Sequence, residues 1–253
     1  MNIWSLSREK MFAECPHALY LYRTAHEEGA SADAPERLRR RYIASRSLLS
    51  YQYARSAVAA ALREFFYYGA TDNVPGWVLR KLARDRFAAG EGRDLTGDGP
   101  PVLLDPENAE GEVRALLANP FLPELLTLLK KVRSIDKVLV PVPVMTGLAD
   151  LQLCAAPVLA FREGLLGWFL TFESHASIDT VLCRYALTQL RIPPARVKFL
   201  RFNGTVEEAM RLDFSAELDH IIYSARRMYS GLYPRTTDRS VCARCRFRFC
   251  CDD

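Results

Sequence analysis

The last dozen residues of the chain carry the pattern with the clearest chemical meaning. Cys242-Ala-Arg-Cys245 places two thiols close together, and a further thiol follows at Cys250 or Cys251. This spacing is typical of metal ligands, because the close pair turns two sulfurs toward one ion and the third thiol closes the site from the following turn. The pattern therefore predicts a metal centre at this end of the chain.

Such a centre needs a fourth ligand, and the sequence offers two sources. One is Cys250 and Cys251 acting together, but the side chains of adjacent cysteines diverge, so that joint ligation strains the backbone. The other is Cys15, in the segment Cys15-Pro16-His-Ala-Leu-Tyr20 near the opposite end. We predict a site that joins the two ends through four thiols: Cys15, Cys242, Cys245 and Cys251.

The composition is that of an ordinary globular protein. Of 253 residues, 49% are hydrophobic and 25% are charged, which is enough to build one large core, and we predict a single domain over residues 1–253. The first ten residues lack the apolar run of a secretory signal, and no apolar run of membrane-spanning length follows. We therefore expect a cytoplasmic protein without a membrane partner, in which seven cysteines indicate metal chemistry rather than disulfides.

The net charge of +4 is small, but the arginines are unevenly distributed. One group lies at residues 37–55, and the other surrounds the last cysteines: Arg226, Arg227, Arg235, Arg239, Arg244, Arg246 and Arg248. The planar guanidinium group suits bidentate contacts to phosphate. The early group is explained equally well as a solvated helix face. For the last group we predict phosphate contacts, made by Arg244, Arg246 and Arg248.

Helical periodicity dominates the first half of the chain, residues 1–132. Ser7 is a reasonable N-cap for a first helix, which Pro16 interrupts after Cys15. Apolar residues at helical spacing then predict helices over 36–68, 75–89 and 107–132.

From about residue 135 the pattern changes to strands, and we assign residues 133–212 to a β-sheet core. Strands are expected over 137–145, 146–154, 158–162, 167–173 and 196–202, with a helix over 178–190 before the last of them. A final helix over 215–230 begins the third region, 213–253, and leads to the cysteines. Helices followed by strands in this order predict an α+β fold.

Asp150 is the strongest candidate for a catalytic metal ligand. It ends the segment Gly147-Leu-Ala-Asp150 on a predicted strand that is followed by a hairpin and a helix. Metal-dependent nucleases use this layout: a carboxylate on one strand, with an acid and a lysine on the next, holds Mg²⁺ or Mn²⁺ and activates water. We therefore predict that Asp150 binds a Mg²⁺ or Mn²⁺ ion.

The second strand of this layout lacks the expected acid and lysine in every alignment. The three alignments place at these two positions Ala160 and Arg162, Glu173 and His175, or Thr171 and Glu173. Arginine binds phosphate but does not release a proton near neutral pH, so Arg162 cannot act as a base. If activity survives, we expect Asp150, Glu173 and His175 to carry it.

These residues together resemble a known family. In chain order the matching residues are Ser7, Cys15-Pro16, Tyr20, Gly147-Leu-Ala-Asp150, Tyr185, Tyr233-Pro234 and Cys242-x-x-Cys245-x5-Cys251. This frame is similar to the iron–sulfur branch of the PD-(D/E)xK nucleases, the RecB-like family that includes the CRISPR adaptation exonuclease and the AddB nuclease domain. The cysteine frame is specific, whereas the other matches rest on the order of the elements.

The resemblance implies a restriction-endonuclease-like core sheet flanked by helices, with a large N-terminal helical part. It also implies a 4Fe–4S cluster held by one N-terminal and three C-terminal cysteines, which selects Cys251 over Cys250. The expected partners are DNA, as ends or single strands, and other proteins of a prokaryotic defence, CRISPR or repair complex. Arg162 and Tyr185 join the arginines of the cysteine segment as expected nucleic-acid contacts.

Three departures from the family pattern bear on catalysis. The motif lysine is replaced, the helix histidine expected near Val58 is missing from Ala57-Val58-Ala59-Ala60, and the glutamine four residues before Tyr185 is Val181. We therefore predict a catalytically weak or inactive nuclease fold that retains DNA binding. The alternative is a zinc-knuckle protein that binds nucleic acid and has no nuclease ancestry.

Overall fold

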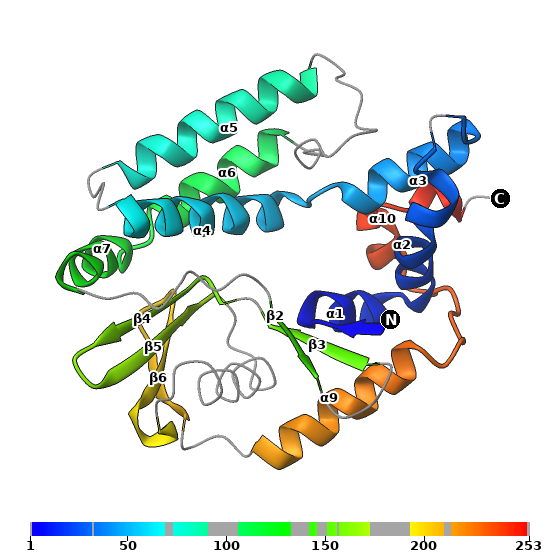
Figure 1. The fold of residues 1–253 in the computed structure, drawn as a ribbon. Helices are drawn as coiled ribbons and strands as arrows, with labels where there is room; N and C mark the ends of the chain where they lie inside the picture. The colour runs from blue at the N-terminus through cyan, green and yellow to red at the C-terminus, as the bar shows by residue number, and fades with distance from the viewer. Residues whose placement is uncertain are drawn as a thin grey trace.

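The structure is a computed structural model that describes residues 2–31, 33–68, 73–90, 106–132, 142–145, 151–155, 157–172, 193–209 and 214–251. It is an α+β protein with a mostly helical N-terminal part, a mixed β-sheet and a C-terminal cysteine segment (Figure 1). Among the described residues, no helix combines the length and the apolar character needed to cross a bilayer. The α+β prediction is confirmed.

The N-terminal part begins with α1 (Leu6–Glu14) and α2 (Pro16–Gly29). The remaining α-helices are α3 (Glu36–Arg46), α4 (Ser50–Tyr68), α5 (Val74–Gly90), α6 (Pro106–Leu117), α7 (Leu122–Lys131), α9 (Phe214–Met228) and α10 (Arg239–Arg244). The cap of α1 is Ser5, whose hydroxyl accepts a hydrogen bond from the Arg8 amide, so the helix starts earlier than the predicted cap Ser7. Proline at the first position of α2 fits the rule that its missing N–H costs nothing there.

Two stretches that periodicity predicts as single helices are each divided in two. Between α3 and α4 the backbone of Ser47 is extended, and its hydroxyl donates to the Ile43 carbonyl at 2.8 Å. Between α6 and α7 the Asn119 side chain accepts from the amide of Phe121 at 2.9 Å, just where Pro120 cannot continue a helix. Local side-chain hydrogen bonds thus compete with the helix at both breaks.

The described strands form two sheets (Figure 1). The first has the order β1-β3-β2 and contains β1 (Asn2–Trp4), β2 (Val142–Met145) and β3 (Leu151–Ala155), with β1 parallel to β3. The second has the order β4-β5-β6-β7 and contains β4 (Leu159–Glu163), β5 (Leu166–Thr171), β6 (Val197–Arg201) and β7 (Val206–Glu208). In the second sheet β5 and β6 are parallel and the outer pairs are antiparallel.

The sheet β4-β5-β6-β7 separates two apolar clusters, as the alternation of side chains along a strand requires. Leu159 and Phe161 of β4 belong to the cluster formed with α4, α5, α6 and α7. Ala160, between them, belongs to the cluster that includes residues of α1, α2 and α9. Phe169 and Leu170 of β5 divide in the same way. Figure 1 shows α4 to α7 on one side of the strands and α9 on the other.

Helices α2 and α3 pack unusually closely at one point, and this contact builds the platform for the C-terminal segment. A Cβ atom on Gly29 would lie 2.1 Å from the Leu38 carbonyl oxygen, so only glycine allows this approach. Arg41 of α3 is buried and donates to the Leu21 carbonyl at 3.2 Å and to Glu28 at 2.8 Å. One arginine of the early group therefore joins two helices instead of lying on a solvated face.

Candidate metal centre

Cys15 lies at the corner between α1 and α2. Its backbone is extended, and its amide donates to the Met11 carbonyl at 2.9 Å. Pro16 then starts α2 in a new direction, so the thiol projects from a fixed corner instead of from a helix face. The side chain is 8% exposed.

The C-terminal cysteines lie on two short turns of helix. Asp238 caps α10 by accepting from the Ser240 amide at 2.8 Å, and Cys242 lies within this helix. Cys245 ends α10, and its amide donates to the Cys242 carbonyl at 3.1 Å. A single 3-10 turn, Arg248–Cys250, follows and places Cys251 just beyond it. The close pair and the later thiol are therefore presented by consecutive turns.

The structure brings the four predicted thiols to one cavity. The cavity has a volume of about 500 Å³ and is lined by Cys15, Cys242, Cys245 and Cys251, together with Arg235, Thr236, Arg239, Val241, Ala243 and Arg248. No disulfide joins any of these four cysteines. Cys250 is 6% exposed and belongs to an apolar cluster with Ala18, Leu21 and Phe247. The two adjacent cysteines thus have different surroundings, and Cys251 is the one at the cavity.

Without a bound cation, the surroundings of the cavity disfavour the thiolate form of its cysteines. Burial raises the pKa of the Cys245 thiol, and the neighbouring thiols Cys15, Cys251 and Cys242 raise it further, while a hydrogen bond from the Phe247 amide opposes the shift. Burial also raises the pKa of Cys251, against the opposing charge of Arg235. Thiolates gathered here repel one another and are poorly solvated, so a metal centre would be needed to hold them in the charged form.

The donor set of four thiols is one that a 4Fe–4S cluster or a single zinc ion takes. Four thiolates ligate a 4Fe–4S cluster, and hydrogen bonds to the sulfurs tune such centres. The Phe247 amide lies 3.4 Å from Cys245 Sγ in this way. Among the described side chains, the four thiols of the cavity included, no group of three or more His, Cys, Asp or Glu residues is arranged as a metal site.

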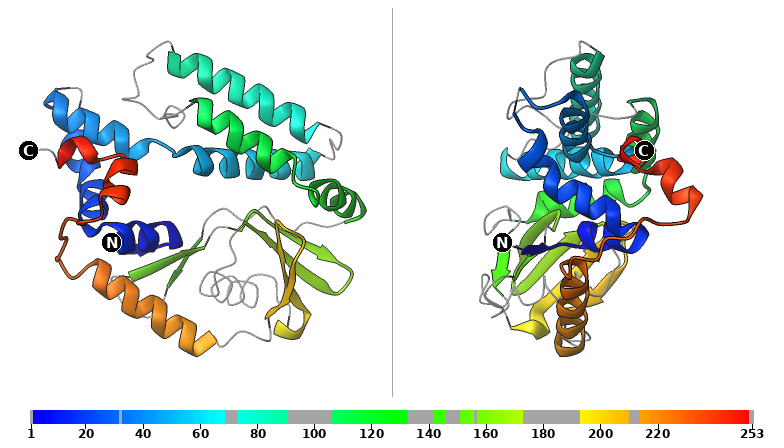
Figure 2. Two further views of the ribbon diagram at one scale, coloured as in Figure 1. Left: turned by 180° about the vertical axis from the view of Figure 1, so that it is seen from behind. Right: turned by 90° about the vertical axis from the view of Figure 1, so that its right-hand side faces the viewer.

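The cysteine segment, residues 239–251, is docked on the N-terminal helices by its arginines and aromatic rings (Figures 1 and 2). Arg246 donates to the Ser47 carbonyl and, at 2.9 Å, to Gln52 Oε1. The guanidinium of Arg40 lies 4.7 Å from the centre of the Phe249 ring, and Phe247 is fully buried. The two ends of the chain are therefore packed together by direct contacts.

The three arginines predicted to contact phosphate do not have the same surroundings. Arg244 and Arg248 are exposed, whereas Arg246 is half-buried and turned toward Ser47 and Gln52. Arg248 lines the cavity, as do Arg235 and Arg239, which sequence reasoning did not select. Their only signal in the sequence was membership of the arginine group around the cysteines.

The predicted catalytic residues Asp150, Glu173 and His175, and also Tyr185, lie outside the described residues. Strand β3 begins directly after Asp150. Arg162 is half-buried in β4, opposite Gly167 of β5. Within the described residues β3 pairs with β1 and β2, and β4 pairs with β5, so these strands do not form one continuous core sheet.

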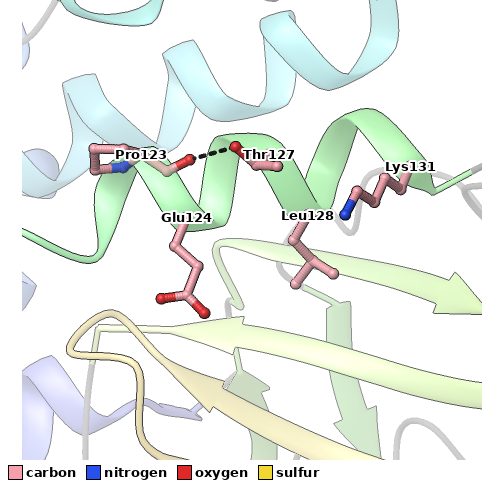
Figure 3. A pocket seen from close by; sticks show the side chains of 5 residues that line it. All are labelled: Pro123, Glu124, Thr127, Leu128 and Lys131. Atoms are coloured by element: carbon pink, nitrogen blue, oxygen red, sulfur yellow. Dashed lines mark hydrogen bonds between the residues drawn. The ribbon is translucent and has the colours of Figure 1, made fainter.

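A second cavity, of about 420 Å³, lies along α7. Figure 3 shows Glu124 and Leu128 pointing from this helix toward the strands, while the Thr127 hydroxyl donates to the Pro123 carbonyl at 2.9 Å. Among the described residues its lining comes from one helix alone, which also supplies Lys131. No set of convergent groups from different elements is present in this lining, in contrast to the cysteine cavity.

Comparisons of this chain with protein-family models, with curated proteins and with solved structures found no match. The case for its function therefore rests on the residues and their geometry.

Proposed function

We propose that this chain is an iron–sulfur protein of RecB-like nuclease fold that binds DNA ends or single-stranded DNA. The observation that carries the proposal is the meeting of Cys15 with Cys242, Cys245 and Cys251 at one cavity. One N-terminal and three C-terminal thiols are the ligand set that the resemblance implies. The same cavity is bordered by exposed arginines, which are suited to phosphate.

The role proposed for the cluster is structural. When bound, it would supply four iron–thiolate bonds that join the corner before α2 to the two turns at the C-terminal end. Closing a loop of this length costs chain entropy, which covalent metal bonds offset. The apolar shield of Phe247 and the docking contacts of Arg246 hold the ligands in place from the protein side.

Catalysis is not required by the proposed role. The missing lysine, histidine and glutamine leave Asp150 as the single family residue of the reaction centre, with Glu173 and His175 as the nearest replacements. The proposed protein is therefore a weak or inactive nuclease that positions DNA or a partner enzyme, within a prokaryotic defence, CRISPR or repair complex. A Mg²⁺ or Mn²⁺ ion at Asp150 is part of the same proposal.

The test is the content of iron, sulfide and zinc, with a visible spectrum, in protein purified without oxygen. We expect brown protein with about four irons and four sulfides per chain, and loss of both in Cys15→Ser. The matched control is Cys250→Ser, which alters a thiol of the same segment outside the cavity and should retain the iron. Colourless protein with one zinc ion, unaffected by Cys15→Ser, would overturn the proposal and leave a zinc knuckle.

A further inference from the structure

Three aromatic rings form a row beside the cysteine cavity. His17 and Tyr20 belong to α2, and Tyr233 belongs to the segment that follows α9. The His17 ring stacks on Tyr20 with 5.8 Å between centroids, and Tyr20 lies 5.6 Å from Tyr233. Tyr20 is 38% exposed and is the most accessible ring of the three. Tyr20, whose ring centre lies 6.0 Å from the Arg41 guanidinium, is therefore partly accessible to solvent on a rigid helix.

Contacts with Arg23 and with the backbone of Pro234 hold the three rings in place. The guanidinium of Arg23 lies 4.4 Å from the centre of the Tyr229 ring and 6.0 Å from that of Tyr233, and it also donates to the Tyr233 hydroxyl. The amide of His17 donates to the Pro234 carbonyl at 3.2 Å, which fixes the irregular segment 231–238 across the start of α2. Little ordering remains for a ligand to impose on these rings, which favours binding.

The aromatic row continues into the arginines of the cavity. Tyr233 and Arg235 are two residues apart in the sequence, so at most about 7 Å separates their Cα atoms. Arg235, Arg239 and Arg248 are all exposed at the cavity. The distance of about 7 Å from Tyr233 to Arg235 corresponds to about two stacked bases at 3.4 Å each.

The charge on this surface is positive. Arg235 donates to the Cys251 carbonyl at 3.0 Å, which leaves its other guanidinium nitrogens available to a ligand. The nearby carboxylate of Asp238 accepts hydrogen bonds from the amide and hydroxyl of Ser240 at 2.8 Å each, and is directed to the cap of α10. An anion with flat apolar groups fits both halves of the surface.

We propose that the row His17–Tyr20–Tyr233 and the arginines Arg235, Arg239 and Arg248 form one binding surface for a single strand of DNA, with a base on Tyr20 and phosphates at the arginines. This inference rests on the proposed function and gives its DNA-binding site. Unpaired bases expose the faces that stack on tyrosine, whereas paired bases in a duplex have theirs covered by their neighbours. The surface therefore prefers a single strand to a duplex.

The test is fluorescence anisotropy with a dye-labelled oligothymidine of 15 nucleotides and with a duplex of 15 base pairs, on anaerobically purified full-length protein. We expect tighter binding of the single strand. Tyr20→Ala should weaken it by between about fivefold and a hundredfold with an unchanged salt dependence, and Tyr20→Phe should bind as wild type does. Arg239→Ala/Arg248→Ala should instead lower the slope of log K against log salt, by about 0.7 for each phosphate that the variant no longer neutralises.

Matched controls lie on α9. Tyr223 is 61% exposed with Arg227 at 5.9 Å from its ring centre, so Tyr223→Ala and Arg226→Ala/Arg227→Ala remove the same chemistry elsewhere and should leave binding unchanged. Iron content and melting temperature show that each variant is folded. If wild type binds neither oligonucleotide, the proposed function fails together with the inference. If wild type binds but the Tyr20 and arginine variants bind equally well, or the duplex binds as tightly, only the inference is overturned.

Discussion

Arg246 donates a hydrogen bond of 2.9 Å to Gln52 across 194 residues of sequence. The same guanidinium donates to the carbonyl of Ser47, a residue that is 1% exposed at the break between α3 and α4. An arginine whose neighbours suggest phosphate binding therefore contributes to holding the cysteine segment on the N-terminal helices. This contact is independent of any metal, because it uses no thiol.

The first prediction concerns the stability that Arg246 contributes. Arg246→Ala removes two hydrogen bonds from a charged donor and leaves the buried Ser47 carbonyl without this partner, so the free energy of unfolding should fall by about 2–3 kcal/mol. Arg244→Ala, two residues away on an exposed position, should change it by less than about 0.5 kcal/mol. Chemical denaturation of both variants measures the difference. Equal stabilities would show that the Arg246 contacts contribute nothing.

The second prediction separates the two adjacent cysteines. Cys251 lines the cavity, whereas Cys250 packs in an apolar cluster, so Cys251→Ser should lose iron and Cys250→Ser should retain it. The buried Cys250 should instead respond to Cys250→Leu, which overfills its site and lowers the melting temperature. Iron analysis and thermal unfolding of the three variants check this. Loss of iron from Cys250→Ser alone would reverse the assignment.

Much of this organisation follows from local sequence patterns. Strands β2 to β6 and the helical stretches 36–68, 75–89 and 107–132 were predicted because side-chain periodicity acts over a few residues, although the first and the last of these stretches are each divided into two helices. Strands β1 and β7 were missed, since each is three residues long and is defined by its pairing partner and not by its own pattern.

The composition of the cavity was predictable only in part. Cys15 was selected because the C-terminal cysteines lacked a fourth ligand, a chemical requirement that holds at any sequence distance. Arg235 was not selected, because an irregular segment has no periodicity from which a direction can be read, and Arg239 was not, because α10 is too short to show one. Arg246 is turned toward the protein, unlike Arg244 and Arg248, because it bonds to Ser47 at the break between α3 and α4. The helical pattern of residues 36–68 gives no sign of this break.

The third prediction concerns removal of the metal. Residues 231–238 form an irregular, mostly exposed segment that is held by two hydrogen bonds, one from the His17 amide to the Pro234 carbonyl and one from Arg235 to the Cys251 carbonyl. Removing the cluster with a chelator should loosen this segment, because the position of Cys251 then depends on non-covalent contacts alone. Trypsin should cleave after Arg235 and Arg239 faster than in the metal-loaded protein, while cleavage after Arg226 and Arg227 of α9 serves as the reference. Unchanged cleavage rates at all four sites would contradict a structural role for the metal.

The fourth prediction tests the helical layer. The Tyr53 hydroxyl of α4 donates to Asp85 of α5 at 2.8 Å, and Lys81 also contacts this carboxylate at 2.7 Å. Tyr53→Phe should reduce the free energy of unfolding by about 1–2 kcal/mol, because Asp85 loses a hydrogen bond to a buried partner. Tyr51→Phe, at a 43% exposed position of the same helix, should have almost no effect.

The same pair has a predictable pH dependence. Burial, followed by the hydrogen bond and charge of Asp85, raises the pKa of Tyr53 above its ordinary value of 10.0. The protonated phenol is thus favoured in the folded state, so its contribution to stability is complete below pH 10 and is lost as the pH rises further. The stability difference between wild type and Tyr53→Phe should shrink above pH 10. A difference that grows there would contradict the assigned donor.

The last prediction concerns Asp150, which the sequence alone identifies. Two-metal chemistry needs several ligands and a group that activates water, and this chain lacks the lysine, histidine and glutamine of the family pattern. We therefore expect wild type to bind labelled single-stranded DNA in Mg²⁺ or Mn²⁺ but to cleave it no faster than Asp150→Asn does. Gel analysis of the oligonucleotide over hours measures cleavage, and anisotropy confirms that both proteins bind. Mn²⁺-dependent cleavage that disappears in Asp150→Asn, and also in Glu173→Gln, would instead identify an active nuclease with Glu173 as its second acid.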